Sequence, residues 1–338
     1  MTLALALLPV LLFVAGLQLM DSFKLVHRGA VVTALSVGVL GAVVCGLLHE
    51  WLQPASGLSA AAFSRYLAPV TEEIIKAAFI VVLMARRRVG FLVDAAVQGF
   101  AVGAGFALAE NLGYLWVLED PPILLWVVRG LGTAMLHGAT TTIFAILAKT
   151  LVDRHPDHVV WAAAPGLAAA IVIHSAFNHV PLPPVAMTLL LLVALPLLVL
   201  AVFHRSEQAT REWVVAGLDL DVELLQLVAS ETFGYTRFGQ YLRQLREQFE
   251  PAVVLDMVCL LRLQLELSVQ AKAMLMAREA GLEIPVDADL RAALAELAYL
   301  EKAIGPTGLL ALKPLQVTSH RDDWHRFLLS RARTTTGA

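Results

Sequence analysis

Four long hydrophobic segments of this 338-residue chain are interrupted by ionisable side chains. Within a membrane-spanning helix such a side chain costs roughly 3 kcal/mol or more, so it is rare there. The segments and their polar residues are 66–85 (Glu72, Glu73 and Lys76), 91–118 (Glu110 and Asn111), 123–150 (His137) and 159–180 (His174 and Asn178). These groups are tolerable when they face one another inside a helix bundle. The chain is thereby restricted to an all-α bundle whose interior carries a polar site.

The apolar segments also set the size of this bundle. A helix that crosses a bilayer needs about 20 predominantly apolar residues. Seven segments meet this requirement: roughly 3–20, 30–48, 66–85, 91–118, 123–150, 159–180 and 184–203. With 58% hydrophobic residues, the chain exceeds the share usual in soluble domains. We therefore predict an all-α, polytopic membrane helix bundle of about seven spans, embedded in a lipid bilayer.

The charged residues divide the chain into two parts. Residues 1–204 contain 10 of the 25 Lys and Arg residues and 10 of the 28 Asp and Glu residues, which leaves 15 and 18 for residues 205–338. We predict a transmembrane domain over 1–204 and a soluble all-α domain over 205–338. In the second domain we expect one helix over 252–280 and another from an N-cap at Asp287 to about Ile304. The net charge of −3 gives no indication of nucleic-acid binding.

The distribution of positive charge predicts how the chain is oriented. Lysine and arginine are enriched in the cytoplasmic loops of membrane proteins. Here they fall in alternate loops: Lys24 and Arg28, Arg86 to Arg88, Lys149 and Arg154, and Arg205 and Arg211. We therefore expect a multi-pass protein with its N-terminus outside and residues 205–338 in the cytoplasm. The amphipathic helices of that C-terminal domain suggest regulation or the binding of a cytoplasmic partner.

The polar groups of the four interrupted segments can share one layer of the membrane. With a rise of 1.5 Å per residue, Glu73, Glu110 and His174 lie about 9–12 Å from the outer ends of their spans. His137 reaches a similar depth if Arg129 marks the membrane surface on its span. The four groups therefore have the ingredients of a metal or acid–base centre in the outer half of the bilayer.

The order of these motifs carries a resemblance. Along the chain they read Glu72-Glu73-x-x-Lys76, Phe106-x-x-x-Glu110-Asn111, His137 and His174-x-x-x-Asn178. This order resembles the PrsW family of intramembrane proteases, which is similar in turn to the superfamily that contains the CAAX prenyl proteases. The resemblance covers most of residues 60–205. It does not extend to the C-terminal domain, so it implies nothing about the role of that part.

The resemblance implies a membrane-embedded endopeptidase of the cell membrane, often described as a metalloprotease. PrsW itself is associated with cleavage of a membrane-bound anti-sigma factor on the outer side. The depth argued above agrees with cleavage there. A single-span membrane protein, similar to an anti-sigma factor, is therefore the expected kind of substrate.

Peptide hydrolysis needs an activated water, a stabilised oxyanion and a proton donor for the leaving amine. Two neighbouring carboxylates cannot both ionise cheaply in a low dielectric, which suits one of them to proton transfer. We expect Glu73 to be the general base, with Glu72 as its close rival. The two side chains point about 100° apart on a helix, so only one of them faces the water directly.

The remaining polar residues suggest a metal site. Glu110, His137 and His174 would form a three-ligand zinc site with an open position. Asn178 and Asn111 would hold the oxyanion or orient a ligand. A metal-free glutamate protease, in which the two histidines stabilise the oxyanion directly, is the alternative within this interpretation.

Two other classes of function use similar residues. Intramembrane glutamate and histidine also form the proton relays of secondary transporters, although no internal repeat of the transporter type is visible here. A non-catalytic scaffold that signals through its cytoplasmic domain is the second alternative. The Glu72–Lys76 pair would then be a structural ion pair within one helix, and His137 an ordinary buried histidine.

Overall fold

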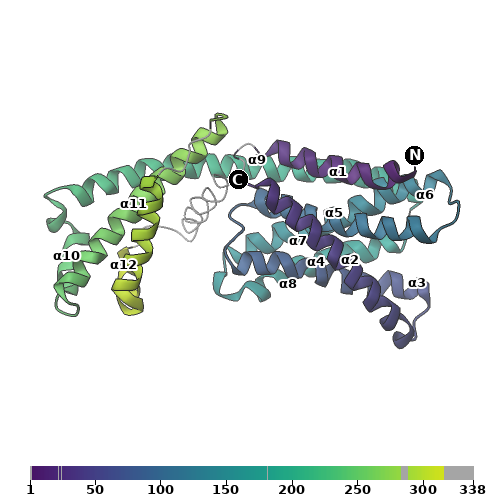
Figure 1. Ribbon diagram of the computed structural model, residues 1–338, viewed down its shortest axis with the longest axis horizontal. Coiled ribbons are helices and arrows are strands. Elements are labelled where there is room, and N and C mark those ends of the chain that lie inside the picture. The colour runs from purple at the N-terminus through teal and green to yellow at the C-terminus, as the bar shows by residue number, and fades with distance from the viewer. Residues whose placement is uncertain (1, 22, 24, 181, 283–287, 316–338) are drawn as a thin grey trace. The chain divides into compact units, whose positions relative to one another are not determined.

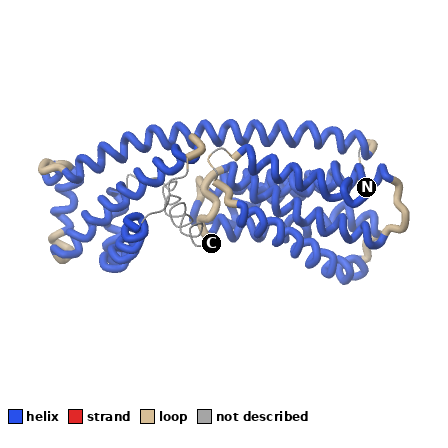
Figure 2. Tube along the Cα trace, turned by 45° about the horizontal axis from the view of Figure 1, so that its top comes forward, coloured by secondary structure: helices blue, strands red, loops and turns tan. Residues whose placement is uncertain are grey.

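The computed structural model describes residues 2–21, 23, 25–180, 182–282 and 288–315, and within these ranges it contains helices and no strand (Figures 1 and 2). The chain divides into two compact units, Met1–Gln208 and Ala209–Ala338. The prediction of an all-α membrane bundle followed by a helical C-terminal part is confirmed. The roles assigned to the two parts stay predictions.

The first unit is built from long helices joined by short turns. The long helices are α1 (Thr2–Met20), α2 (Arg28–Ser56), α4 (Ala68–Ala85), α5 (Leu92–Val117), α7 (Ala134–Val152), α8 (Val159–Asn178) and the beginning of α9 (Pro184–Ala229). The short elements are α3 (Ala60–Ala62), the π-helical turn η1 (Phe63–Leu67), α6 (Ile123–Val128), the π-helical turn η2 (Arg129–Thr133) and the 3-10 turn η3 (Pro156–His158). The segment 49–65 is thus largely helical.

Six of the described helices are long and apolar enough to cross a membrane. They are Thr2–Met20, Arg28–Ser56, Leu92–Val117, Ile123–Val152, Pro156–Asn178 and Pro184–Ala229. The remaining predicted span, 66–85, corresponds to α4, whose 18 residues include Glu72, Glu73 and Lys76. The last helix continues without interruption past residue 204, so the predicted domain boundary lies within α9.

Helix α5 forms the centre of the bundle. Its residues 93–107 are all buried, and it packs against α1, α2 and α7. Close approach depends on glycine: a Cβ atom on Gly103 would collide with the backbone carbonyl of His137, and one on Gly105 with that of Leu35. Small residues permit such contact between membrane helices. This packing fixes α7, and with it His137, at a short distance from α5.

Within its described residues, the second unit contains three further α-helices, α10 (Arg237–Leu245), α11 (Pro251–Glu279) and α12 (Ala288–Leu312). The predicted helix 252–280 corresponds to α11. The predicted N-cap, Asp287, lies outside the described residues, and α12 continues beyond Ile304 after a break at Gly305 (φ 71°). Within this unit, Lys272 Nζ lies 2.6 Å from Asp221 Oδ2, and both side chains are buried.

Candidate active site

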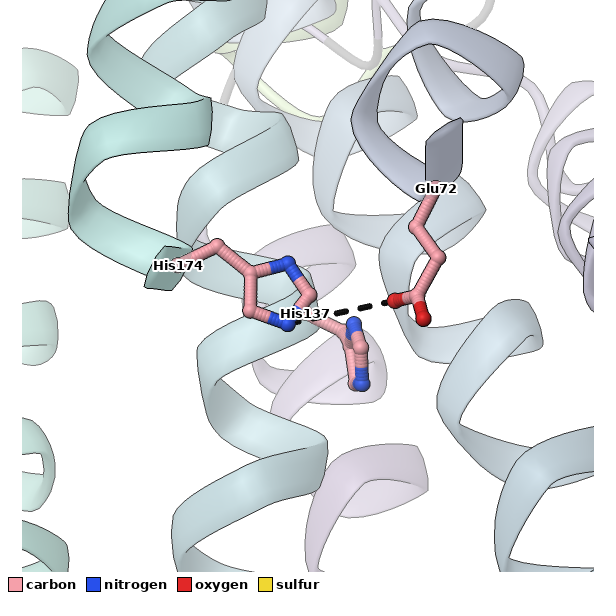
Figure 3. A group of neighbouring side chains, drawn as sticks. All are labelled: Glu72, His137 and His174. Atoms are coloured by element: carbon pink, nitrogen blue, oxygen red, sulfur yellow. Dashed lines mark ion pairs between the residues drawn. The ribbon is translucent and has the colours of Figure 1, made fainter. Parts of the chain in front are cut away.

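Three helices bring one carboxylate and two imidazoles together. Glu72 on α4, His137 on α7 and His174 on α8 each place one potential ligand atom so that the three atoms lie within 4.8 Å of one another (Figure 3). Both histidines are almost completely buried, and the Glu72 side chain is 13% exposed. We call these three residues the central cluster.

His174 is held by the two adjacent glutamates of α4. Its Nδ1 atom lies 2.8 Å from Oε1 of Glu73, and its Nε2 atom faces Oε2 of Glu72 at 3.8 Å. A carboxylate that accepts from one ring nitrogen of a histidine fixes the ring and leaves the other nitrogen available. The Glu73 contact therefore directs Nε2 of His174 toward the cluster.

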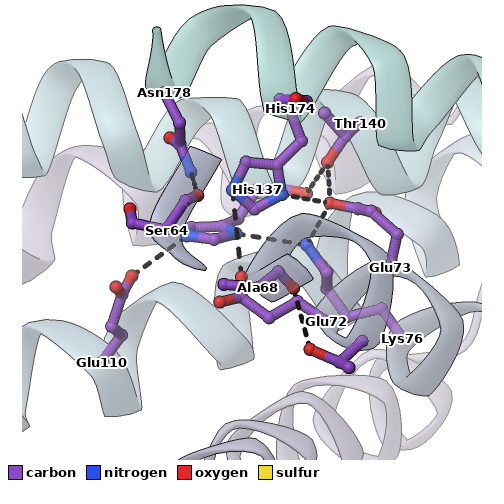
Figure 4. Close-up of polar contacts among 12 residues, drawn as sticks. Ser64, Ala68, Glu72, Glu73, Lys76, Glu110, His137, Thr140, His174 and Asn178 are labelled. Carbon is purple, nitrogen blue, oxygen red and sulfur yellow. Dashed lines mark hydrogen bonds and ion pairs between the residues drawn. The ribbon is translucent and has the colours of Figure 1, made fainter. Parts of the chain in front are cut away.

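Glu73 is tied into the protein by several donors. Besides His174, its Oε1 atom contacts Lys76 Nζ at 2.6 Å and accepts a hydrogen bond of 3.0 Å from Thr140 Oγ1 (Figure 4). Glu73 and Lys76 are each only 1% exposed. Ionic hydrogen bonds of this kind stabilise the buried charge. Glu73 therefore orients His174, and its bonded oxygen is occupied by protein groups.

Glu72 has the opposite environment. Among the described residues, its Oε2 atom is buried and has no hydrogen-bond partner. A buried carboxylate oxygen without a donor is rare in folded proteins and needs an explanation. Its direction toward Nε2 of His174 indicates a position where a cation or a water molecule would complete the site.

His137 lies between an ammonium group and a carboxylate. Its Nδ1 atom is 3.1 Å from Lys76 Nζ, and its Nε2 atom is 3.0 Å from Oε2 of Glu110 on α5. The rings of His137 and His174 are 5.0 Å apart and perpendicular. His137 is thus backed by Glu110 in the way that His174 is backed by Glu73.

One residue of this site, Arg129, was not predicted from the sequence. Arg129, expected only to mark the membrane surface, is 9% exposed, and its Nη2 atom lies 3.3 Å from Oε2 of Glu110. Its Nε atom donates to Oδ1 of Asn111 at 3.0 Å, and its guanidinium carbon lies 3.5 Å from the ring centre of Tyr114. An arginine inside an apolar span was the available signal, because such residues pair within the bundle.

The structure does not direct the two predicted oxyanion donors at the cluster. Asn178 Nδ2 donates to the carbonyl of Ser64 at 2.9 Å. Asn111 Nδ2 donates to the carbonyl of Ala6 at 2.8 Å, and its Oδ1 atom accepts from Arg129. Both amide groups therefore connect helices, and their catalytic roles stay predictions.

The predicted metal-ligand set differs from the central cluster at one position. His137 and His174 belong to both sets, whereas Glu72 takes the place expected for Glu110. Glu110 lies behind His137, on the side of Arg129. The structure thus groups the predicted base and the predicted ligands in one polar centre. Glu72 occupies the ligand position that was predicted for Glu110, and Glu110 supports His137 instead.

The donors of the central cluster fit a divalent metal ion. Two imidazole nitrogens and one carboxylate oxygen form the three-ligand set of many catalytic zinc sites. The orphaned Oε2 atom of Glu72 supplies a ready ligand. Three carboxylates and two basic side chains meet here, with a formal sum of −3 + 2 = −1 for neutral imidazoles. One further cation is therefore compatible with the charge of the site.

Comparison with known proteins identifies a family. Residues 22–203, more than half of the chain, match the family model described as PrsW family intramembrane metalloprotease. No curated protein and no solved structure matches the chain. The matched region includes every residue of the central cluster and ends within α9.

Proposed function

Because the chain belongs to the PrsW family of intramembrane metalloproteases, we propose that it is an intramembrane endopeptidase that hydrolyses a membrane-protein substrate near the outer face of the membrane. One observation carries the proposal: Glu72, His137 and His174 converge from three helices inside an otherwise apolar bundle. Burying these groups is costly in lipid, and a shared catalytic task explains why they meet.

The residues proposed to hold the metal are Glu72, His137 and His174, and the proposed metal is zinc. When bound there, zinc would polarise a peptide carbonyl and make water a better nucleophile at neutral pH. Lys76 Nζ lies 3.1 Å from Nδ1 of His137 and also contacts Glu73. Nδ1 becomes available to a metal ion only when Lys76 gives up this contact and stays bonded to Glu73.

The surrounding residues orient the central cluster. Glu73 fixes the ring of His174, and Glu110 fixes the ring of His137. Lys76 and Thr140 hold Glu73 in place by donating to its Oε1 atom. The site is thus preorganised before substrate arrives, which lowers the reorganisation needed in the transition state.

Hydrolysis adds a water oxygen to the scissile carbonyl carbon, breaks the C–N bond and moves a proton to the amine nitrogen. Glu72 is better placed than Glu73 to face these atoms, because its Oε2 atom has no hydrogen-bond donor in the described part of the chain. As a metal ligand it would hold the centre. In a metal-free site the same carboxylate would take the proton from water and pass it to the amine.

The metal-free form has one specific observation in its favour. The contact between Lys76 Nζ and Nδ1 of His137 uses the nitrogen that a metal would need. In that form the cationic side chain of Lys76 and the two imidazoles would stabilise the oxyanion. The two forms differ in one measurable property, the dependence of cleavage on a metal ion.

We also propose the topology and the class of substrate. Glu73 and His174 lie near the beginning of α4 and the end of α8, and the loop at the other end of α4 carries Arg86, Arg87 and Arg88. The positive-inside rule places that loop in the cytoplasm and the site toward the outside. The N-terminus is then outside and the C-terminal unit cytoplasmic. A single-span membrane protein, similar to an anti-sigma factor, reaches such a site from the bilayer.

The test compares membranes from cells that produce the wild-type chain, Glu72→Gln or His174→Ala, together with Glu50→Gln as a matched control with an exposed glutamate. New protein N-termini that appear with the wild type and the control, but with neither cluster variant, support the proposal and identify substrates. Identical N-termini in all four samples contradict it. Chelation of the purified protein, followed by addition of zinc, then separates the two forms of the site.

A further inference from the structure

Each histidine of the central cluster contacts a carboxylate, which in turn contacts a cation. The two chains are His174–Glu73–Lys76 and His137–Glu110–Arg129 (Figure 4 shows all of these residues except Arg129). The contacts along the second chain are 3.0 Å and 3.3 Å. The family motifs quoted above include the cation of the first chain, Lys76, but not that of the second.

Arg129 is held on three sides, which leaves its guanidinium little freedom. Its Nε atom donates to Asn111, and its planar group lies over the ring of Tyr114. Its Nη2 atom is buried, faces Glu110 at 3.3 Å and has no hydrogen-bond partner among the described residues. A guanidinium that is stacked on an aromatic ring and hydrogen-bonded at Nε has a fixed position, so it can hold the neighbouring carboxylate in place.

A local irregularity, the π-helical turn η2, places Arg129 on the same face as His137, toward Glu110. In a regular α-helix the eight residues from Arg129 to His137 turn through about 800°, which leaves the two side chains about 80° apart. Residues 129–133 instead form the π-helical turn η2, in which the N–H of Ala134 bonds to the carbonyl of Arg129. This turn takes up one extra residue. The remaining seven residues correspond to about 700°, so both side chains reach Glu110.

The contacts of His137 define one tautomer. An ammonium group only donates hydrogen bonds, and an ionised carboxylate only accepts them. The Nδ1 atom therefore accepts from Lys76, and the Nε2 atom carries the proton and donates it to Glu110. In this tautomer the lone pair of Nδ1 faces Lys76 Nζ, and it can serve the central cluster when that contact is released.

We propose that Arg129 is a positioning residue, which holds Glu110 so that His137 keeps its proton on Nε2 and presents Nδ1 to the central cluster. The inference rests on the proposed function of that cluster. Without the guanidinium, Glu110 loses its buried cation and its fixed orientation, so Lys76 is the remaining contact that selects this tautomer. The other tautomer of His137 then becomes populated whenever Lys76 turns from Nδ1 to Glu73 alone. Removing such an outer partner typically lowers metal affinity by about 10–100-fold.

The test measures the tautomer directly. The full-length protein, with nitrogen-15 in its histidine rings, is studied by NMR in lipid nanodiscs after chelation, and the signals of His137 are identified by their loss in His137→Gln. The wild type is expected to show His137 protonated at Nε2 alone. Arg129→Met is expected to show both tautomers. Lys149→Met is the matched control. Lys149 lies on α7, is buried like Arg129 and pairs with a carboxylate, that of Asp153.

A second variant protects the test against misfolding of Arg129→Met. Tyr114 is 41% exposed, so Tyr114→Leu removes the stacking surface of Arg129 at little cost to the fold. It is expected to shift the tautomers in the same direction by a smaller amount. An unchanged tautomer of His137 in whichever of the two variants folds would overturn the proposal, as would an equal shift in Lys149→Met.

Zinc affinity, measured by competition with a chelator, is the second readout. Arg129→Met is expected to bind zinc about 10–100-fold more weakly than the wild type and the Lys149→Met control. A wild-type protein that binds no zinc would contradict the metal site proposed above, whereas the role of Arg129 would still be decided by the NMR result. The two proposals therefore fail separately.

Discussion

Glu72 and Glu73 are neighbours in the chain, yet their carboxylates lie in opposite environments. Oε1 of Glu73 contacts three protein donors, whereas Oε2 of Glu72 is buried without a hydrogen-bond partner among the described residues. Successive helix positions point about 100° apart, so the Glu73 carboxylate contacts Nδ1 of His174 whereas the Glu72 carboxylate faces Nε2 of the same ring. This division of roles can be tested by mutation.

Substitution of Glu73 should damage both stability and activity. Glu73→Gln leaves the buried ammonium of Lys76 without its carboxylate, and breaking such a pair costs about 3–5 kcal/mol. Glu72→Gln breaks no hydrogen bond of the protein at Oε2, so it should abolish cleavage while leaving stability nearly unchanged. Thermal unfolding in detergent, measured beside cleavage, checks both expectations.

The double variant Glu73→Gln/Lys76→Met is the control for this comparison. Neutralising both members of the pair removes the uncompensated buried charge that makes loss of one partner costly. The double variant should therefore regain much of the lost melting temperature and remain inactive. Equal melting temperatures for Glu73→Gln and Glu72→Gln would show that the Glu73–Lys76 pair does not contribute to stability.

Thr140 should matter for activity through its hydroxyl alone. Thr140→Val keeps the shape of this fully buried side chain but removes the hydrogen bond to Glu73. A hydrogen bond to a charged group contributes about 1.5–3 kcal/mol to stability, so Thr140→Val is expected to lower the free energy of unfolding by about that amount. It is also expected to lower kcat/KM, because Glu73 then holds His174 less firmly. Thr142→Val is matched to it, because Thr142 is also fully buried but donates to the carbonyl of Gly138. Equal losses in both variants would rule out a specific effect through Glu73.

Gly103 should not tolerate a methyl group. Its missing Cβ atom makes room for the backbone carbonyl of His137, so Gly103→Ala must push α7 away from α5. We expect lower stability together with weaker zinc binding. Gly113→Ala on the same helix has no atom within 4 Å of the new Cβ, and it should be neutral or more stable by about 0.5–1 kcal/mol. Melting temperatures and zinc titrations of the two variants provide the comparison.

Asn178 should restrain the turn η1 if its main role is structural. Its side chain donates to the carbonyl of Ser64, and Ser175 Oγ donates to the adjacent carbonyl of Arg65. Asn178→Ala and Ser175→Ala should then both accelerate hydrogen exchange over residues 59–67. If Asn178 is instead the predicted oxyanion donor, its substitution should lower kcat by about 100-fold or more without a matching change in Ser175→Ala.

The main features of the site followed from simple rules. A charged or imidazole side chain in an apolar span must face a partner, so Glu110, His137 and His174 were expected to meet Glu72 or Glu73. The family resemblance added the order of the motifs. These inferences depend on spacing along single helices, which the sequence displays directly.

Other features depend on contacts between helices and were not accessible. The exchange of Glu72 and Glu110 between ligand and supporting positions is set by how α4 and α5 rotate against α7. The contacts of Asn178 and Asn111 with backbone carbonyls arise from neighbouring helices. The π-helical turn that aligns Arg129 has no reliable signature in composition, because its residues also form ordinary α-helix.

The π-helical turn η2 also has a consequence for protein engineering. A designer who seeks a more regular and more stable helix would keep the length of the chain and substitute residues 129–133 so that they adopt the ordinary α-helical repeat. The redesigned helix would satisfy every local criterion of regular geometry. It would nevertheless carry Arg129 about a quarter of a turn away from Glu110. The π-helical turn η2 should therefore be left intact when this protein is redesigned for stability, because it keeps Arg129 directed at Glu110.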